Sequence, residues 1–168
     1  IGTTTVVCHL IDGKTGEKLA TVSEPSAQRS FGADVLSRIQ AAEAGKLEIL
    51  KEQIIFQIAQ MLRTLQKKTG RGEQIQRLAV VGNTVMCHLF AGISPVSIGV
   101  TPFMPQEFFG KEYTGEQLGL TDCRSVYIAP AVAGFVGGDI TSDLLAVMQK
   151  KPKDKVLLLD IGTNGEMA

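Results

Sequence analysis

Two short stretches near opposite ends of the chain combine glycine with small hydroxyl or amide side chains. The first is Ile1-Gly2-Thr3-Thr4-Thr5, and the second is Asp160-Ile161-Gly162-Thr163-Asn164-Gly165. In both stretches glycine allows backbone N–H groups to close around an anion, and threonine or asparagine side chains add short donors. A carboxylate at the end of a preceding strand can hold a hydrated Mg²⁺. The pair predicts two phosphate-binding hairpins, with Asp160 as the Mg²⁺ ligand and the following residues as anion contacts: Gly2, Thr3, Thr4, Thr5, Gly162, Thr163, Asn164 and Gly165.

Either stretch taken alone is typical of an ordinary turn, because glycine and threonine are common where strands end. Two copies about one domain apart, the second following a helix opened by Gly137-Gly138, favour a shared ligand site instead. Asp139 lies at the start of that helix and is a candidate catalytic or water-positioning residue, with helix capping as the alternative. Asn83 follows a predicted strand, so it is a ligand contact, the N-cap of the next helix, or both.

The periodicity of apolar residues predicts the elements that position these stretches. Alternating or β-branched runs indicate strands, and steps of three and four indicate helices. We expect strands at 3–11, 17–23, 78–81, 125–129 and 156–161, and helices at 31–44, 47–65, 84–90 and 139–148. The proline-containing segment 95–120 is expected to be irregular. This alternation predicts an α/β fold with a mixed, mostly parallel sheet and helices on both faces.

The composition is that of an ordinary globular protein and argues against several classes of partner. The 168 residues are 44% hydrophobic and 20% charged, and 17 Lys plus Arg balance 17 Asp plus Glu. This balance lacks the basic excess that nucleic-acid binding uses, and no apolar run approaches the ~20 residues of a membrane span. We therefore expect a cytoplasmic protein whose partners include neither nucleic acid nor membrane. Because the chain begins at Ile1 and stops just after a new strand starts, both ends are expected to be cuts through a longer protein.

The three cysteines, Cys8, Cys87 and Cys123, are too far apart for a disulfide framework or a CxxC metal site. Two of them precede histidines, in Cys8-His9 and Cys87-His88. Neighbours on a strand or a helix point in different directions, so neither pair can readily close on one metal ion. We expect reduced, mostly buried thiols.

The two hairpins, joined by a small-residue stretch and a helix at 129–148, resemble the superfamily of actin, sugar kinases and the large heat-shock chaperones. Members of that superfamily hold ATP between two similar subdomains, each with a phosphate hairpin. The resemblance implies an actin-like ATPase (RNase H-like) subdomain over 1–154, which contains the first hairpin and the crossing helix. It also implies that 155–168 are the first strands of a second subdomain.

A closer similarity lies in the runs 28–35, 80–86, 130–139 and 160–166, which resemble the ATP-binding domain of the reductive activators of corrinoid proteins. The resemblance implies ATP and Mg²⁺ as cofactors, and ATP-dependent reduction of an inactivated corrinoid (cobalamin-type) protein of a methyltransferase system. It also implies a [2Fe-2S] cluster in a separate domain as the electron source, so this chain alone is expected to be inactive. A homodimer stays open, as do two alternative functions: a small-molecule kinase, and a non-catalytic scaffold whose nucleotide controls assembly.

Overall fold

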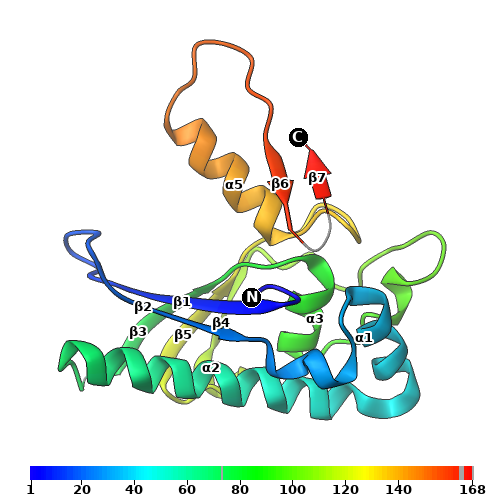
Figure 1. The fold of residues 1–168 in the computed structure, drawn as a ribbon, viewed down its shortest axis with the longest axis horizontal. Coiled ribbons are helices and arrows are strands. Elements are labelled where there is room, and N and C mark those ends of the chain that lie inside the picture. The colour runs from blue at the N-terminus through cyan, green and yellow to red at the C-terminus, as the bar shows by residue number, and fades with distance from the viewer. Residues whose placement is uncertain (73, 163–164, 168) are drawn as a thin grey trace.

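The computed structural model of the chain describes residues 1–72, 74–162 and 165–167 and has a mixed α/β structure (Figure 1). Its strands are β1 (Thr5–Ile11), β2 (Lys18–Pro25), β3 (Ile75–Val80), β4 (Lys111–Thr114), β5 (Cys123–Ile128), β6 (Leu159–Ile161) and β7 (Gly165–Met167). Its α-helices are α1 (Val35–Ala41), α2 (Leu47–Thr69), α3 (Thr84–Ala91), α4 (Gly115–Leu118) and α5 (Gly138–Gln149). None of the described helices is long and apolar enough to cross a membrane.

The described strands form three separate sheets. β1 pairs with β2 in antiparallel register, from Thr5↔Pro25 to Ile11↔Lys18. β5 is the middle strand of a second sheet, parallel to β3 and antiparallel to β4, and β6 pairs antiparallel with β7. The mixed α/β class is confirmed. The expectation of a mostly parallel sheet is wrong for these strands, because few residues separate β1 from β2 and β6 from β7, and strands so close in the sequence pair antiparallel.

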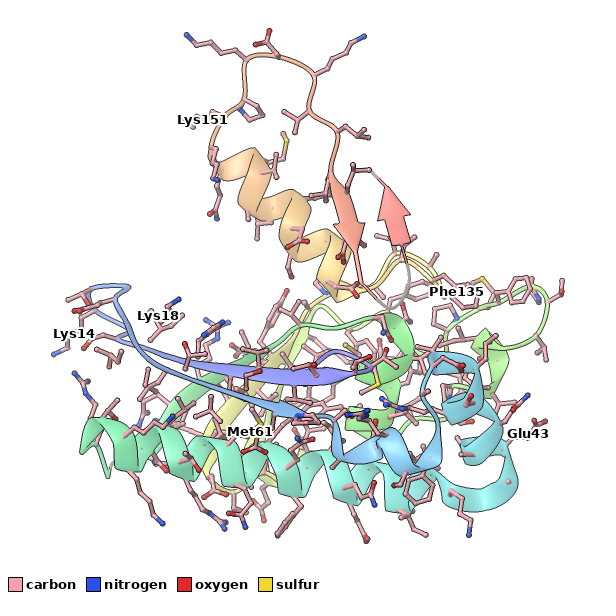
Figure 2. All side chains as sticks on the ribbon, in the orientation of Figure 1. Lys14, Lys18, Glu43, Met61, Phe135 and Lys151 are labelled. Carbon is pink, nitrogen blue, oxygen red and sulfur yellow. The ribbon has the colours of Figure 1, made fainter. Side chains whose placement is uncertain are left out.

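α2 is the long helix that lies along one side of the strands (Figure 1). Its apolar residues recur at steps of three and four and are at most 1% exposed, as the sequence predicted: Leu50, Ile54, Ile58, Met61 and Leu65. Figure 2 shows Met61 on the side of α2 that faces the strands, where it belongs to the same core cluster as Val6 and Val126. Burying one such side chain contributes roughly 1.5–3 kcal/mol. The helix holds the sheets in place from this side.

The opposite face of β1 is open in the described part of the chain. Val7 and Ile11 are 44% and 55% exposed, whereas Val6, whose side chain lies on the face of β1 toward α2, is fully buried. The expectation of helices on both faces is therefore wrong along this strand. α5 does not cover it, because α5 and the β6–β7 pair stand away from the other strands, with Lys151 near the far end (Figures 1 and 2).

Most predicted elements differ from the structure in their bounds, by one to four residues in most cases. The helix expected over 31–44 begins only after Asp34, whose carboxylate accepts a hydrogen bond from the Ser37 N–H at 2.8 Å. The chain then kinks at Gly45, where φ is 80°. The segment expected to be irregular contains β4 and α4, and Thr114 and Gln117 cap α4 reciprocally. The strand expected from residue 156 begins at Leu159.

Candidate functional site

A cavity of about 330 Å³ lies where the first residues of the chain meet the starts of α3 and α5 and the end of β6. It is lined by Ile1, Gly2, Thr3, Thr4, Thr5, Val81, Gly82, Asn83, Asp139, Asp160 and Gly162. The structure thus brings both glycine-containing stretches and Asp139 to one place. Thr163 and Asn164 lie outside the described residues, and Gly165 is the first residue of β7.

The first stretch forms a tight reversal directly before β1. The Gly2 N–H donates to the Thr5 carbonyl at 3.0 Å, so Thr3 and Thr4 form the tip of a hairpin. A Cβ at Gly2 would lie 2.7 Å from that carbonyl oxygen, which excludes any larger residue without rearrangement. Thr3 is only 5% exposed, and its Oγ1 accepts a hydrogen bond from Asn83 Nδ2 at 3.1 Å. The tip is therefore a fixed element with hydroxyl groups at one wall of the cavity.

Arg38 supports this hairpin from beneath and was not predicted as a site residue. Its side chain is fully buried, and its guanidinium donates to the carbonyl oxygens of Thr3 and Gly32 and to Gln28 Oε1. No carboxylate forms an ion pair with Arg38 among the described residues, and burial lowers its pKa to about 10. The charge of Asp34 offsets this effect only in part, so a positive charge without a direct ion-pair partner lies under the hairpin and favours an anion above it. Sequence reasoning could not identify Arg38, because nothing in the sequence distinguishes one arginine in an amphipathic helix from an ordinary surface arginine.

Asn83 is the N-cap of α3, which is one of its two predicted roles, and it also contacts the tip of the first hairpin. Its Oδ1 accepts a hydrogen bond from the Met86 N–H at 2.9 Å, which makes it the N-cap of α3. Its amide nitrogen binds Thr3, so the same side chain joins the helix start to the hairpin tip. Asn83 also lines the cavity, where a direct ligand contact stays a prediction.

Two glycines let the first turns of α3 and α5 meet at the cavity. A Cβ at Gly82 would lie 2.6 Å from the Ile1 carbonyl oxygen, and a Cβ at Gly137 would lie 2.6 Å from Asn83 Cα and from Thr84 N. The Asp139 N–H donates to the Gly82 carbonyl at 3.2 Å across this contact. Helix N-termini carry partial positive charge and bind anions, so both ends favour a negative ligand.

Among the residues that the structure describes, Asp139 and Asp160 are the carboxylates that line the cavity. Asp139 is half-buried in the first turn of α5, and its Oδ1 accepts a hydrogen bond from the Ile140 N–H at 3.0 Å. Burial raises the pKa of the Asp139 carboxyl above its usual range, and the charge of Asp160 raises it further. Asp139 is not the cap that the alternative interpretation expected, because Gly137 is the N-cap of α5 and no side chain caps the helix; Asp139 instead satisfies one N–H group from within the first turn. Two carboxylates in one cavity also form a setting in which a bound cation is stabilising.

The described residues include no group of three or more His, Cys, Asp and Glu side chains that could hold a metal ion. A Mg²⁺ at Asp160 would therefore need phosphate oxygens and water as its other ligands, which is the usual coordination of Mg²⁺ beside nucleotides. The donor set fits this group: one or two carboxylates for the cation, and hydroxyls, an amide and backbone N–H groups for the phosphates.

Cys87 and His88 are adjacent and buried on α3, and their side chains have different hydrogen-bond partners. His88 Nδ1 lies 2.7 Å from the Thr84 carbonyl oxygen, so Nδ1 carries the proton, and Nε2 accepts from the Glu107 N–H at 3.3 Å. Burial lowers the pKa of His88 and raises the pKa of the Cys87 thiol to about 12. A neutral imidazole and a protonated thiol are structural groups here.

The fold and the cavity define an α/β domain in which two glycine-containing stretches, far apart in the sequence, line one pocket. The sequence matches the family described as the RACo middle region over residues 1–151. The chain belongs to this family.

The relatives of the chain have names that refer to corrinoid activation. It is 34% identical over 175 positions to the corrinoid activation enzyme RamQ of Eubacterium limosum, covering 100% of this chain and 29% of the relative. It is 27% identical over 189 positions to the [Co(II) methylated amine-specific corrinoid protein] reductase of Methanosarcina barkeri, covering 100% of this chain and 32% of the relative.

A solved structure of a reductive activator for corrinoid, iron-sulfur protein has a TM-score of 0.93 to this chain and is 37% identical. The match covers 99% of this chain and 27% of that one. The chain thus spans about a third or less of each of these relatives, so the activity of a whole protein of this kind enters below as a proposal.

Proposed function

We propose that this chain is the phosphate-binding part of an ATP-dependent enzyme that reduces an inactivated corrinoid protein. The observation that carries the proposal is that residues 2–5 line one cavity together with Asp160 and Gly162, which are far from them in the sequence. The names of the relatives support the reaction, since two refer to corrinoid activation and one to a corrinoid protein reductase.

In this proposal the ATP phosphates bind between the two hairpins. Gly2 to Thr5 contact them from one side, and Gly162, Thr163, Asn164 and Gly165 contact them from the other. The starts of α3 and α5 and the charge of Arg38 favour the anion electrostatically. Asp160 holds Mg²⁺ together with phosphate oxygens, and Asp139 positions a water molecule in the same cavity.

The electron for the reduction comes from a [2Fe-2S] cluster in a separate domain of the enzyme. The partner of the enzyme is the corrinoid protein of a methyltransferase system. Bound ATP would supply a conformational switch, because a partner that binds differently with and without nucleotide shifts the reduction equilibrium. This chain contributes a hinge to that switch. α5 meets α3 through the contact between the Asp139 N–H and the Gly82 carbonyl, next to Gly137 and Gly138.

The test is the affinity of the full-length protein for Mg·ATP, measured by calorimetry. Asp160→Asn keeps the shape of the side chain and removes its charge, so we expect affinity to fall at least about tenfold, or 1.4 kcal/mol. Asp154→Asn is the matched control, since Asp154 is exposed on the segment between α5 and β6 and outside the cavity lining. Equal affinities of the wild type and Asp160→Asn would contradict the assignment of Asp160 as the Mg²⁺ ligand.

A further inference from the structure

Two neighbouring segments beside α3 contain no charged residue and expose apolar side chains. They are residues 95–106, between α3 and β4, and residues 130–137, between β5 and α5. Exposed apolar clusters of this kind mark interaction surfaces, and the cores of protein–protein interfaces are poor in charges and rich in aromatic residues and methionine. We call the exposed apolar residues of these two segments the aromatic patch: Val100, Phe103, Met104, Val132 and Phe135.

The aromatic patch is built where the two segments touch. The rings of Phe103 and Phe135 meet edge to face with their centroids 5.8 Å apart, and Phe135 lies beside the segment 95–106 (Figure 2). A Cβ at Gly134 would lie 2.3 Å from the Phe103 carbonyl oxygen, so the two backbones are also in contact. The patch therefore has a defined shape, although Phe103 and Phe135 are 44% and 45% exposed.

Phe103 has a backbone conformation that its side chain disfavours. Its φ is 61°, in the left-handed region that bulky residues rarely adopt, and such a conformation costs about 1–3 kcal/mol. Burial of the ring does not repay this cost, because nearly half of the side chain is exposed. Strained residues of this kind cluster at binding sites, so the exposed ring of Phe103 is a candidate contact for a partner.

The aromatic patch is connected to the candidate phosphate site through Thr84. The hydroxyl of Thr84 donates to the Ala133 carbonyl at 2.7 Å, two residues before Phe135. Thr84 is fully buried and directly follows Asn83, which lines the cavity, and the backbone of Gly137 packs against both residues. A shift of α3 and α5 around bound phosphate would therefore also move the patch.

We propose that the aromatic patch is the surface on which the corrinoid protein docks, through an apolar and uncharged face of that protein. The inference rests on the proposed function, in which ATP controls how the enzyme binds this partner. A nucleotide changes the affinity only for a molecule whose contacts differ between the two states of the enzyme. The contact through Thr84 gives the aromatic patch this property, and it selects the corrinoid protein as the occupant.

The test is the affinity of the full-length enzyme for the corrinoid protein of its own methyltransferase system, measured by biolayer interferometry without nucleotide. Phe135→Ser and Phe103→Ser each remove one ring of the patch. Phe56→Ser is the matched control, since Phe56 is 65% exposed on α2 and lies outside the patch. We expect the Kd to rise at least about tenfold in the two patch variants and to stay within about twofold in the control.

Steady-state reduction of the corrinoid protein gives a second measurement. In Phe135→Ser we expect the KM for the corrinoid protein to rise by the same factor, with kcat and the affinity for Mg·ATP unchanged. A folded Phe135→Ser enzyme that binds the corrinoid protein as tightly as Phe56→Ser would overturn the proposal. A loss of thermal stability or of self-association in the patch variants alone would also overturn it, because the enzyme itself or a second copy would then cover the patch.

These measurements separate the docking surface from the proposed function. An enzyme that binds the corrinoid protein through the patch but does not bind ATP would contradict the proposed function alone. An enzyme that binds ATP and reduces the corrinoid protein equally well in all variants would contradict the docking surface alone.

Discussion

Replacing Arg38 tests whether a buried guanidinium holds the first hairpin in place. Arg38→Met keeps an apolar stem of similar length and leaves the Thr3 carbonyl and Gln28 Oε1 without this donor. Each buried acceptor that loses its partner costs about 1–3 kcal/mol, and removal of a buried charge that has no direct ion-pair partner offsets part of that sum. We expect the free energy of unfolding to fall by about 2–4 kcal/mol.

Arg38→Lys is expected to recover only part of this loss, because one ammonium group cannot reach acceptors on Thr3, Gln28 and Gly32 together. Urea denaturation followed by circular dichroism measures the change. Hydrogen exchange reports whether the amides of the hairpin open faster.

Arg63→Met is the matched control, since Arg63 is half exposed and pairs with Asp122 on the surface, where such pairs contribute about 1 kcal/mol or less. An Arg38→Met protein that is as stable as this control, with unchanged exchange in the hairpin, would refute the supporting role of Arg38.

Two further predictions concern backbone packing and pH. Gly137→Ala places a Cβ 2.6 Å from Asn83 Cα, so we expect the free energy of unfolding to fall by at least about 2 kcal/mol. In the control variant Gly72→Ala the new Cβ meets nothing within 4 Å, so this variant should be as stable as the wild type. Equal thermal stabilities of the two variants would contradict the prediction. The pKa of His88 is lower in the folded protein, so the unfolded chain binds a proton at this histidine more readily than the folded chain does. The contribution of His88 to the free energy of unfolding is therefore fully present above pH 6.5 and is lost as the pH falls below that value. His88→Gln should make unfolding less pH-dependent between pH 7 and 5, and an unchanged pH profile would be inconsistent with a buried neutral imidazole.

The sequence predicted the parts of the site that depend on local chemistry. Glycine and threonine spacing singled out the two stretches that line one cavity, and their binding of phosphate stays a prediction. The position of Asn83 after a strand predicted its capping role. Arg38 could not be found in this way, because its importance comes from contacts with Thr3 and Gln28 that exist only after folding. The close approach at Gly137 depends in the same way on where α5 meets α3.

The errors in the fold have equally local causes. Periodicity cannot separate α1 from the turn before it, since the helix start is set by the hydrogen bond between Asp34 and Ser37. The capping pair Thr114 and Gln117 was readable in the sequence and would have revealed α4. The sheet was predicted as mostly parallel because alternating strands and helices suggest it, whereas the short hairpins add antiparallel pairs.

The central claim is that the cavity shared by the two hairpins couples Mg·ATP to reduction of a corrinoid protein. The most direct measurement follows the cobalt absorbance of the corrinoid partner while the full-length protein reduces it, with and without ATP. We predict that Asp160→Asn lowers the ATP-dependent rate at least about tenfold, while Asp154→Asn does not, and while electron transfer to small artificial acceptors is unchanged in both. An Asp160→Asn protein that melts normally and reduces its partner at the wild-type rate would contradict the claim.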